Sequence, residues 1–470
     1  YLEKAVALAD AAMIPLEDAV EAISSRLVDS MMIRAYAKKG YAIPLHRHEE
    51  REENEEKIRG AYVHPMTAGV YNYIGVADFK SLYPSIMMQY NICWTTIADD
   101  DESVPDEDCH IIEYTEEGDD EVRTVKHRFY KPHIKKGVLP EIIENLMQER
   151  TKTKKAMKME REKGNIKRAK YLDDLQGSIK IIMNSFYGLH ASQFYRFTDR
   201  RIGEAITGFA REAILGVISK TEEMGYKVVG SDTDSCFYDF DAVSLTEAVR
   251  LLNNVCSELS TGYLILEPEK VFNTFFNHGK KKNYFGDIAW ENGDFLVKPV
   301  LYVRGYGVRR RDRYPLQKKY LERFMKAVIE RANMDLFWNE IATELQNFDP
   351  DPSELVITVS VRDEKYYKNP DGMPSVKAVR KLKERGIPHF DGMRVSYIIT
   401  SGKTPQEVEP VLENEDYPVP DLRHYRNSII KTLAGDKRNP GPSTVWGWTA
   451  DSLMNGTKKS TLDEYFEGAF

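Results

Sequence analysis

The pattern of apolar and polar positions opens with helical spacing and then changes character. Residues 1–40 place apolar side chains at helical intervals, and this pattern stops at Gly40. The stretch 46–59 is highly charged and predicts a loop. "VYNYIGVADF" (70–79) is rich in β-branched and aromatic residues, which predicts a strand that runs into Asp78.

Helical and extended patterns alternate through the rest of the chain. Pro84 suits the first turn of a helix, with Ser81 or Tyr83 near the cap. The further predicted elements are long helical stretches at about 140–170 and 172–188 with a break near or just after Gly164-Asn165, a helix at 200–225, mixed strands over 260–310, and a helix-rich remainder with a strand at 354–361 and a loop at 403–421. This mixture of helices and strands predicts an α+β protein.

Two aspartates stand one residue apart in "VVGSDTDSCFYDF" (228–240), between two hydrophobic runs. Such a pattern predicts a β-hairpin with Asp232 and Asp234 at its tip. No cation in the same stretch balances them. A polar turn without function is the alternative.

Composition limits the classes of protein that fit this pattern. The 470 residues suggest roughly three domain-sized units, and 42% are hydrophobic, enough for sizeable cores. No apolar run reaches the length of about 18 residues that a membrane span needs, and no signal peptide is visible. Four cysteines lack CxxC spacing, which argues against zinc, iron–sulfur and disulfide modules and favours a reducing compartment: Cys93, Cys109, Cys236 and Cys256.

Charge is distributed unevenly along the chain, whose net charge is −8. The segment 99–121 holds 13 acidic residues and no Lys or Arg, and we expect it to be an exposed insertion. The segment 150–170 holds ten Lys or Arg against two Glu, and smaller basic clusters lie at 279–284 and 308–313. Each run alone is compatible with a solvated face, but three basic clusters in an acidic chain favour contact with a polyanion.

Three carboxylates are candidates for a metal site. Asp78 ends a predicted strand, and Asp232 and Asp234 lie at a hairpin tip far away in the sequence. Hard divalent cations such as Mg²⁺ take oxygen ligands and bridge to substrate phosphates. A two-metal site of this kind serves phosphoryl transfer.

Basic side chains in the middle of the chain are candidates for binding a polyphosphate. Lys180, Asn184 and Tyr187 share one face of a helix because they are four and three residues apart. Arg150 and Lys154 are four apart on the preceding helix. An antiparallel helix pair would present all three cations to one polyphosphate, whereas most other lysines in this run fit a solvated surface.

Four short motifs carry a resemblance to the family B DNA polymerases. The segment "DFKSLYPSIMMQYNI" (78–92) resembles their motif A, and "KIIMNSFYG" (180–188) resembles motif B. "SDTDS" (231–235) resembles motif C, and "KKNY" (281–284) resembles the KKxY element. Their order and spacing agree with the family over nearly the whole chain, and archaeal-type members show the nearest pattern.

The chain departs from this family in two respects. Gly230-Ser231 stands where motif C usually has Tyr-Gly, so the approach to the primer end is less certain. No DxE motif opens the chain, which begins at Tyr1. We therefore expect a polymerase core without the amino-terminal and exonuclease domains, and without a cysteine-rich carboxy-terminal module.

The resemblance implies a right-hand architecture with an antiparallel-sheet palm, helical fingers and a mostly helical thumb. The implied divisions are a linker from a missing exonuclease domain at 1–59, palm at 60–139, fingers at 140–199, palm again at 200–312, and thumb at 313–470.

The resemblance also implies the roles of individual residues. Two Mg²⁺ ions, which Mn²⁺ can replace, would bind Asp78, Asp234, supporting Asp232 and the carbonyl of Phe79. The triphosphate would rest on Ser81, Leu82 and Tyr83, and Tyr83 would also exclude a ribose 2′-hydroxyl. The β- and γ-phosphates of the nucleotide would contact Arg150, Lys154 and Lys180. Asn184 and Tyr187 would shape the base-pair side of the pocket. The DNA backbone would contact Lys281, Lys282 and Tyr284, with Arg304, Arg310 and Arg311 as weaker candidates.

The implied activity is DNA-templated DNA synthesis from dNTPs on a primer–template, in the cytoplasm near the nucleoid if the source is archaeal. Leu462, Tyr465 and Phe466 have the spacing of a sliding-clamp-binding peptide, although Lys459 stands where Gln is usual; packing against the thumb is the alternative. Glu267 and Glu269 are weaker candidates for a further metal site, against ordinary surface glutamates. Two other functions stay open: a catalytically silent scaffold subunit, and one piece of a split polymerase that acts beside a separate exonuclease-bearing chain.

Overall fold

The computed structural model describes residues 2–21, 24–44, 58–99, 103–117, 122–191, 195–308, 310 and 312–458. The chain divides into two compact units. The first comprises Tyr1–Val63, Val76–Cys236 and Leu251–Glu269, and the second comprises His64–Gly75, Phe237–Arg250 and Lys270–Phe470.

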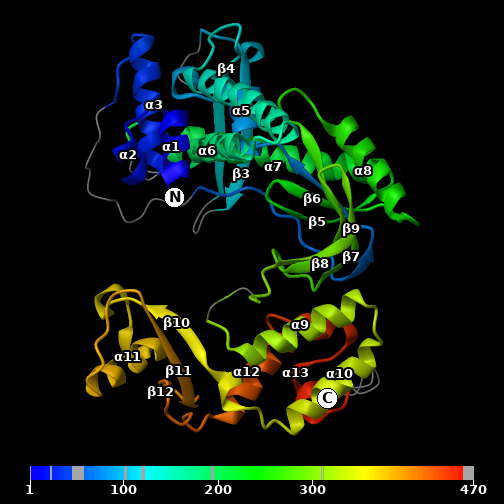
Figure 1. The fold of residues 1–470 in the computed structure, drawn as a ribbon. Coiled ribbons are helices and arrows are strands. Elements are labelled where there is room, and N and C mark those ends of the chain that lie inside the picture. The colour runs from blue at the N-terminus through cyan, green and yellow to red at the C-terminus, as the bar shows by residue number, and fades with distance from the viewer. Residues whose placement is uncertain are drawn as a thin grey trace. The chain divides into compact units, whose positions relative to one another are not determined.

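Helices dominate the first unit, and Figure 1 shows α5 beside α6. Gly164, with φ of 75°, ends the turn after α5, and the Asn165 side chain caps α6 by accepting from the Arg168 amide. The predicted break is therefore confirmed, but α6 starts six residues before the predicted 172. The helices of this unit are α1 (Leu2–Ala12), α2 (Leu16–Glu21), α3 (Ser24–Lys38), α4 (Leu82–Gln89), α5 (Val138–Glu162), α6 (Ile166–His190) and α7 (Arg200–Glu223); α8 (Leu245–Leu259) is divided between the units at Arg250.

A seven-stranded sheet has the order β5-β6-β2-β7-β8-β9, with β1 paired to β7. Its strands are β1 (Gly69–Asn72), β2 (Gly75–Phe79), β5 (Lys227–Asp232), β6 (Ser235–Asp239), β7 (Leu266–Asn277), β8 (Tyr284–Glu291) and β9 (Asp294–Arg304). The single strand predicted at 70–79 is wrong: the backbone turns at Tyr73, with φ of 53°, and separates β1 from β2. The predicted hairpin around Asp232 and Asp234 is present as β5 and β6.

The acidic segment at 99–121 is not simply an exposed insertion. Its residues Cys109–Glu117 form β3, which pairs antiparallel with β4 (Val122–Tyr130). Ile112 is buried, and Gly208 of α7 leaves the space that Ile112 and Tyr114 occupy. The β-branched and aromatic residues of this segment, Ile111, Ile112, Tyr114 and Thr115, were the strand signal that the charge count concealed.

The second unit packs helices around a large apolar core that includes Trp338, Trp448 and Phe324. Its helices are α9 (Pro315–Ile329), α10 (Met334–Gln346), α11 (Pro374–Glu384), α12 (Leu422–Ala434) and α13 (Ala450–Asn455), and its own sheet has the order β10 (Ile357–Val361), β11 (Met393–Ser401), β12 (Glu407–Pro410). Short 3₁₀ helices of this unit lie at Pro352–Leu355, Glu364–Tyr366, Pro370–Gly372 and Pro442–Trp446. Two others, Trp94–Thr96 and Asp106–Asp108, belong to the first unit. The predicted loop at 403–421 is partly wrong, because β12 pairs there with β11.

The α+β prediction is confirmed by this mixture of helices and antiparallel strands. The ranges described above contain no helix long and apolar enough to cross a bilayer.

Candidate active site

The candidate site begins where β2 meets the β5–β6 hairpin. β2 and β6 are neighbours in the sheet, and the Phe79 amide donates to the Asp234 carbonyl at 2.8 Å. This hydrogen bond fixes the end of β2 against the hairpin tip. It brings Asp78 and Asp234 together although they are far apart in the sequence.

The hairpin tip is a tight turn whose geometry separates the two motif aspartates. Thr233 takes a φ of 68°, and the Asp234 amide donates to the Asp232 carbonyl at 2.8 Å. Asp232 is only 7% exposed, whereas Asp234 is partly exposed. The turn therefore leaves Asp234 facing the cavity, and Asp232 is not among the residues that line it.

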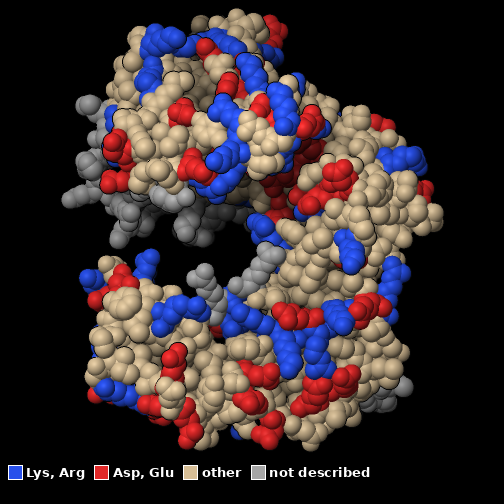
Figure 2. All heavy atoms as spheres, viewed as in Figure 1, with Lys and Arg blue, Asp and Glu red and all other residues tan. Residues whose placement is uncertain are grey.

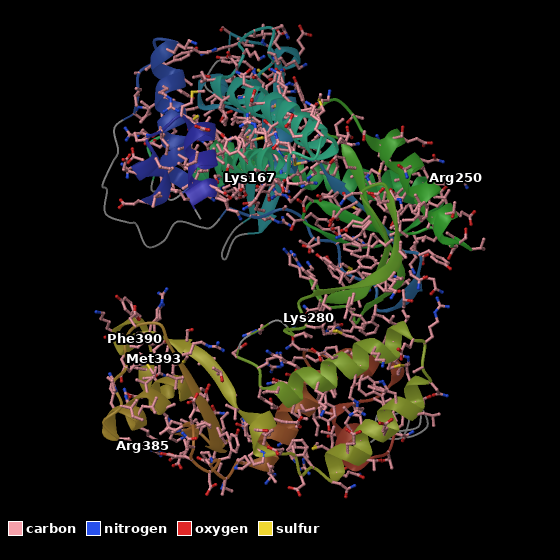
Figure 3. All side chains as sticks on the ribbon, in the orientation of Figure 1. Lys167, Arg250, Lys280, Arg385, Phe390 and Met393 are labelled. Atoms are coloured by element: carbon pink, nitrogen blue, oxygen red, sulfur yellow. The ribbon has the colours of Figure 1, made fainter. Side chains whose placement is uncertain are left out.

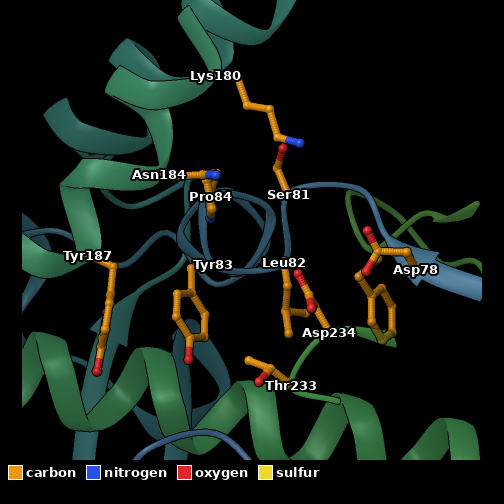
Figure 4. Close-up of a pocket in the computed structure, with 11 residues that line it drawn as sticks. Asp78, Ser81, Leu82, Tyr83, Pro84, Lys180, Asn184, Tyr187, Thr233 and Asp234 are labelled. Carbon is orange, nitrogen blue, oxygen red and sulfur yellow. The ribbon is translucent and has the colours of Figure 1, made fainter. Parts of the chain in front are cut away.

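A cavity of about 330 Å³ lies between the end of β2, α4, α6 and the hairpin tip. Figure 4 shows Lys180 reaching from α6 toward Ser81, with Asp78 and Asp234 on the other side of the cavity. The lining residues are Asp78, Phe79, Ser81, Leu82, Tyr83, Pro84, Lys180, Asn184, Tyr187, Thr233 and Asp234. Most of the residues predicted for the metal and nucleotide therefore converge in one space.

The start of α4 shapes one wall of this cavity. Ser81 is the N-cap, not Tyr83, and its left-handed backbone (φ 52°, ψ 61°) turns the chain sharply from β2 into the helix. The rings of Tyr83 and Tyr187 are 4.5 Å apart with an interplanar angle of 43° (Figure 4). Burial, together with Tyr187 and Asp234, raises the pKa of Tyr83 to about 12, so its hydroxyl stays protonated at neutral pH.

Asp234 experiences an unfavourable environment for its own charge. Burial raises the pKa of this carboxyl, and the negative charges of Asp232 and Glu269 add to the effect. A backbone hydrogen bond and the charge of Lys180 oppose it without cancelling it. A carboxylate in such surroundings gains from a bound cation.

The cavity offers oxygen donors of the kind that a divalent cation takes. Among the described residues, no group of three or more His, Cys, Asp or Glu side chains is close enough to hold a metal ion as they stand. The two carboxylates that line the cavity are oxygen donors, and burial together with the charges of Asp232 and Glu269 raises the pKa of Asp234. These residues fit a hard divalent cation, which brings its own water or phosphate ligands.

The other two predicted phosphate-binding cations lie outside the cavity wall. Arg150 donates to Gln176 Oε1 at 3.3 Å. Lys154 is exposed on α5, and its pKa is lowered by burial and by the charge of Arg150. They belong to the basic run on α5 and α6, and Figure 2 shows blue side chains over this part of the first unit.

The predicted DNA contacts lie in the second unit. Lys281 and Lys282 are exposed in the turn before β8, next to Lys280 in Figure 3. Tyr284 is 5% exposed, and its ring packs on Phe237 and Phe275.

The remaining predicted contacts are of three kinds. Arg304 lies opposite Tyr284 in the β8–β9 ladder. Arg310 binds Asp312. Arg311, Leu462, Tyr465 and Phe466 lie outside the described residues.

The sequence analysis missed several residues around the site. Thr233 and Pro84 line the cavity, and both stood inside quoted motifs, which was the available signal. Lys80 forms an ion pair with Glu267 at 3.4 Å. No sequence signal predicted that pair, because Lys80 follows β2 whereas Glu267 lies in β7, far away in the sequence.

Comparison with solved structures first places the fold. The structure of the family B DNA polymerase from the hyperthermophilic archaeon Pyrobaculum calidifontis is similar with a TM-score of 0.63 and 22% identity, covering 92% of this chain and 53% of that one. The DNA polymerase family B model matches residues 14–434. The chain belongs to this family.

Curated relatives come from both eukaryotes and archaea. The DNA polymerase delta catalytic subunit of Schizosaccharomyces pombe is 28% identical over 87% of this chain and 38% of its own length. The DNA polymerase of Thermococcus gorgonarius is 28% identical over 82% of this chain and 47% of its own length. The chain thus spans less than half the length of these relatives.

Proposed function

We propose that this chain is the catalytic core of a DNA-templated DNA polymerase, which adds dNTPs to a primer 3′-hydroxyl and releases pyrophosphate. The observation that carries the proposal is the cavity in which Asp78 and Asp234 face Lys180. Oxygen donors for a cation and a fixed positive charge for a phosphate are the two requirements of nucleotidyl transfer. Family membership supports the same reaction class.

Asp78, Asp234 and the Phe79 carbonyl would hold two Mg²⁺ ions, with Asp232 in support behind the turn. When bound, such ions activate the primer hydroxyl and neutralise charge on the leaving oxygen, and Mn²⁺ can replace them. The protein's own contribution is to hold both carboxylates on strand ends that hydrogen bonds keep in register.

The nucleotide would lie along the start of α4. The backbone of Ser81, Leu82 and Tyr83 would contact the triphosphate, and Lys180 would meet it from α6. Arg150 and Lys154 would complete the contacts to the β- and γ-phosphates, and Asn184 would line the base-pair side.

The sugar would face the packed rings of Tyr83 and Tyr187. Because a ring held in this way cannot move aside easily, a ribose 2′-hydroxyl should clash with Tyr83. Replacing Tyr83 with Ala should therefore raise ribonucleotide insertion relative to deoxynucleotide insertion.

Primer–template DNA would contact Lys281 and Lys282 in the turn before β8 and Tyr284 at the start of β8, with Arg304, Arg310 and Arg311 as weaker candidates. Such phosphate contacts are independent of DNA sequence and weaken with salt. The proposed divisions are palm at 60–139 and 200–312, fingers at 140–199 and thumb at 313–470.

Two partners are proposed from the sequence alone. Leu462, Tyr465 and Phe466 would bind a sliding clamp, and a separate chain would supply exonuclease activity. Deleting 459–470 should shorten clamp-dependent products on long templates and leave single-nucleotide insertion unchanged. A loss of single-nucleotide insertion together with a lower melting temperature would instead assign this peptide to the thumb.

A silent scaffold subunit is the alternative function. The presence of Asp78, Asp234 and Lys180 around one cavity argues against it, because a scaffold has no need of that combination. Primer extension by the purified chain with Mg²⁺ and dNTPs, on templates of different sequence, distinguishes the two. Products that follow the template support the polymerase, and no extension under any metal or salt condition contradicts it.

A further inference from the structure

Lys80 is held rigidly between two residues that line the cavity. Its amide donates to the Ile265 carbonyl at 2.9 Å, and its carbonyl accepts from Ser85 Oγ at 2.8 Å. These bonds fix its backbone between Phe79 and Ser81, and its side-chain Nζ lies 3.4 Å from Glu267 Oε1.

The segment just before Glu267 is hydrogen-bonded to α4 and to α5, the helix that carries Arg150 and Lys154. The Tyr263 amide donates to Gln89 Oε1 of α4 at 2.9 Å, and the Tyr263 hydroxyl donates to Glu144 Oε1 of α5 at 3.1 Å. Arg150 and Lys154 follow on α5. The charge of Glu267 acts on both Arg150 and Lys154, besides its ion pair with Lys80.

The charges in this region are strongly unbalanced. The pKa of Lys154 is lowered overall. Burial and the charges of Arg150, Lys80 and Lys180 lower it, and the charge of Glu267 opposes them in part. Glu267 also opposes the effect of burial on the pKa of Arg150. The cation cluster is defined as Lys80, Arg150, Lys154 and Lys180; Glu267 pairs with Lys80, and its charge acts on Arg150 and Lys154.

We propose that Glu267 is an internal counter-ion of the cation cluster. In the empty site its carboxylate pairs with Lys80 and takes the place of part of the triphosphate. The arriving nucleotide displaces the Glu267 carboxylate from Lys80. Lys80 then becomes a further contact to the phosphates. Glu267 would set how tightly the empty site binds a polyphosphate. It is a positioning residue and does not touch the reacting atoms.

A merely structural ion pair is the competing account. Lys80 and Glu267 are 37% and 54% exposed, and pairs with such exposure contribute little to stability. A structural role would therefore leave almost nothing to measure in ligand binding, whereas a counter-ion must change the affinity for any polyanion at this site. This inference rests on the proposed triphosphate site.

The test uses inorganic tripolyphosphate and the full chain, with EDTA present, in a calorimetric titration. Glu267→Gln should bind tripolyphosphate roughly threefold to tenfold more tightly than the wild type, since one partly screened repulsive charge is removed. Glu258→Gln removes an exposed carboxylate from α8 and should bind like the wild type. Melting temperatures of all three proteins should agree.

Lys80→Met should weaken tripolyphosphate binding, and in that background Glu267→Gln should bring a smaller gain than in the wild type. With dNTP, Glu267→Gln should lower KM with little change in kcat. If the wild type binds tripolyphosphate and Glu267→Gln binds it equally well, the counter-ion assignment is wrong. If the wild type binds none while Glu267→Gln does, the assignment stands in its strongest form, and if neither binds, the proposed triphosphate site itself fails.

Discussion

Two groups of acidic side chains in the first unit differ in how their charge is balanced. The buried carboxylate cluster consists of Asp99 and Glu204, which bind the two ring nitrogens of His127 at 3.1 and 2.8 Å. Glu204 also accepts from Arg123 and Arg200. The cavity carboxylates, Asp78 and Asp234, face an open space instead.

The pKa shifts follow this difference in balance. Burial alone would raise the pKa of Glu204, but hydrogen bonds from His127, Arg200 and Arg123 lower it to about 2. In Asp234 the effect of burial prevails and the pKa is raised. A carboxylate satisfied within the protein serves the fold, whereas one left under-compensated is available to a ligand.

The largest expected effect comes from removing a cavity carboxylate. Asp234→Asn should lower primer extension by roughly a thousandfold or more, because one metal ligand supplies several kcal/mol of transition-state stabilisation. Its unfolding free energy should stay the same or rise, since a disfavoured charge is lost. Single-turnover extension and denaturant unfolding measure the two effects. Asp241→Asn, in the loop after β6, is the matched control and should change neither.

Removing the buried carboxylate should have the opposite effect, with stability lost and activity retained. Glu204→Gln should lower the unfolding free energy by about 3 kcal/mol, because Glu204 is 1% exposed and its loss strands His127 and two arginines. The folded fraction should still extend primers. Glu113→Gln breaks an exposed ion pair between Glu113 of β3 and Lys126 of β4. It should lower the unfolding free energy by less than about 0.5 kcal/mol. Equal costs for the two variants would contradict the comparison.

Lys180 supplies the positive charge opposite the cavity carboxylates. Lys180→Ala should raise KM for dNTP and lower kcat, each by roughly tenfold, because the charge it meets exists in the ground state and grows in the transition state. Lys167→Ala, at the start of the same helix (Figure 3), is the control and should retain both parameters. Steady-state kinetics that leave Lys180→Ala unchanged would remove this lysine from the site.

The smallest effect concerns the pH dependence of the buried cluster. Burial lowers the pKa of His127, but hydrogen bonds to Asp99 and Glu204 outweigh it and raise the pKa above the usual value. The protonated imidazole therefore stabilises the fold below about pH 6.5, and this contribution disappears as pH rises through the raised pKa. Between pH 6 and 8.5 the unfolding free energy of the wild type should fall by about 1 kcal/mol more than that of His127→Asn. Parallel curves for the two proteins would show that His127 is neutral throughout.

The sequence alone determined the features that depend on neighbouring residues. The break at Gly164-Asn165, the cap at Ser81 and the hairpin around Thr233 follow from backbone sterics and local hydrogen bonds, which act over a few residues. The motifs also singled out residues that line one cavity, whose functional roles stay predictions. Asp78, Lys180 and Asp234 are examples.

Only the tertiary structure decided which distant segments meet. The turn at Tyr73 and the pairing of β12 with β11 depend on strands elsewhere in the sheets, so the local pattern predicted neither. The charge of Glu204 looked like any other in the sequence until His127 and two arginines enclosed it. Asp232 and Asp234 looked equivalent until one was buried and the other faced the cavity, because long-range pairing and burial determine what a carboxylate can bind.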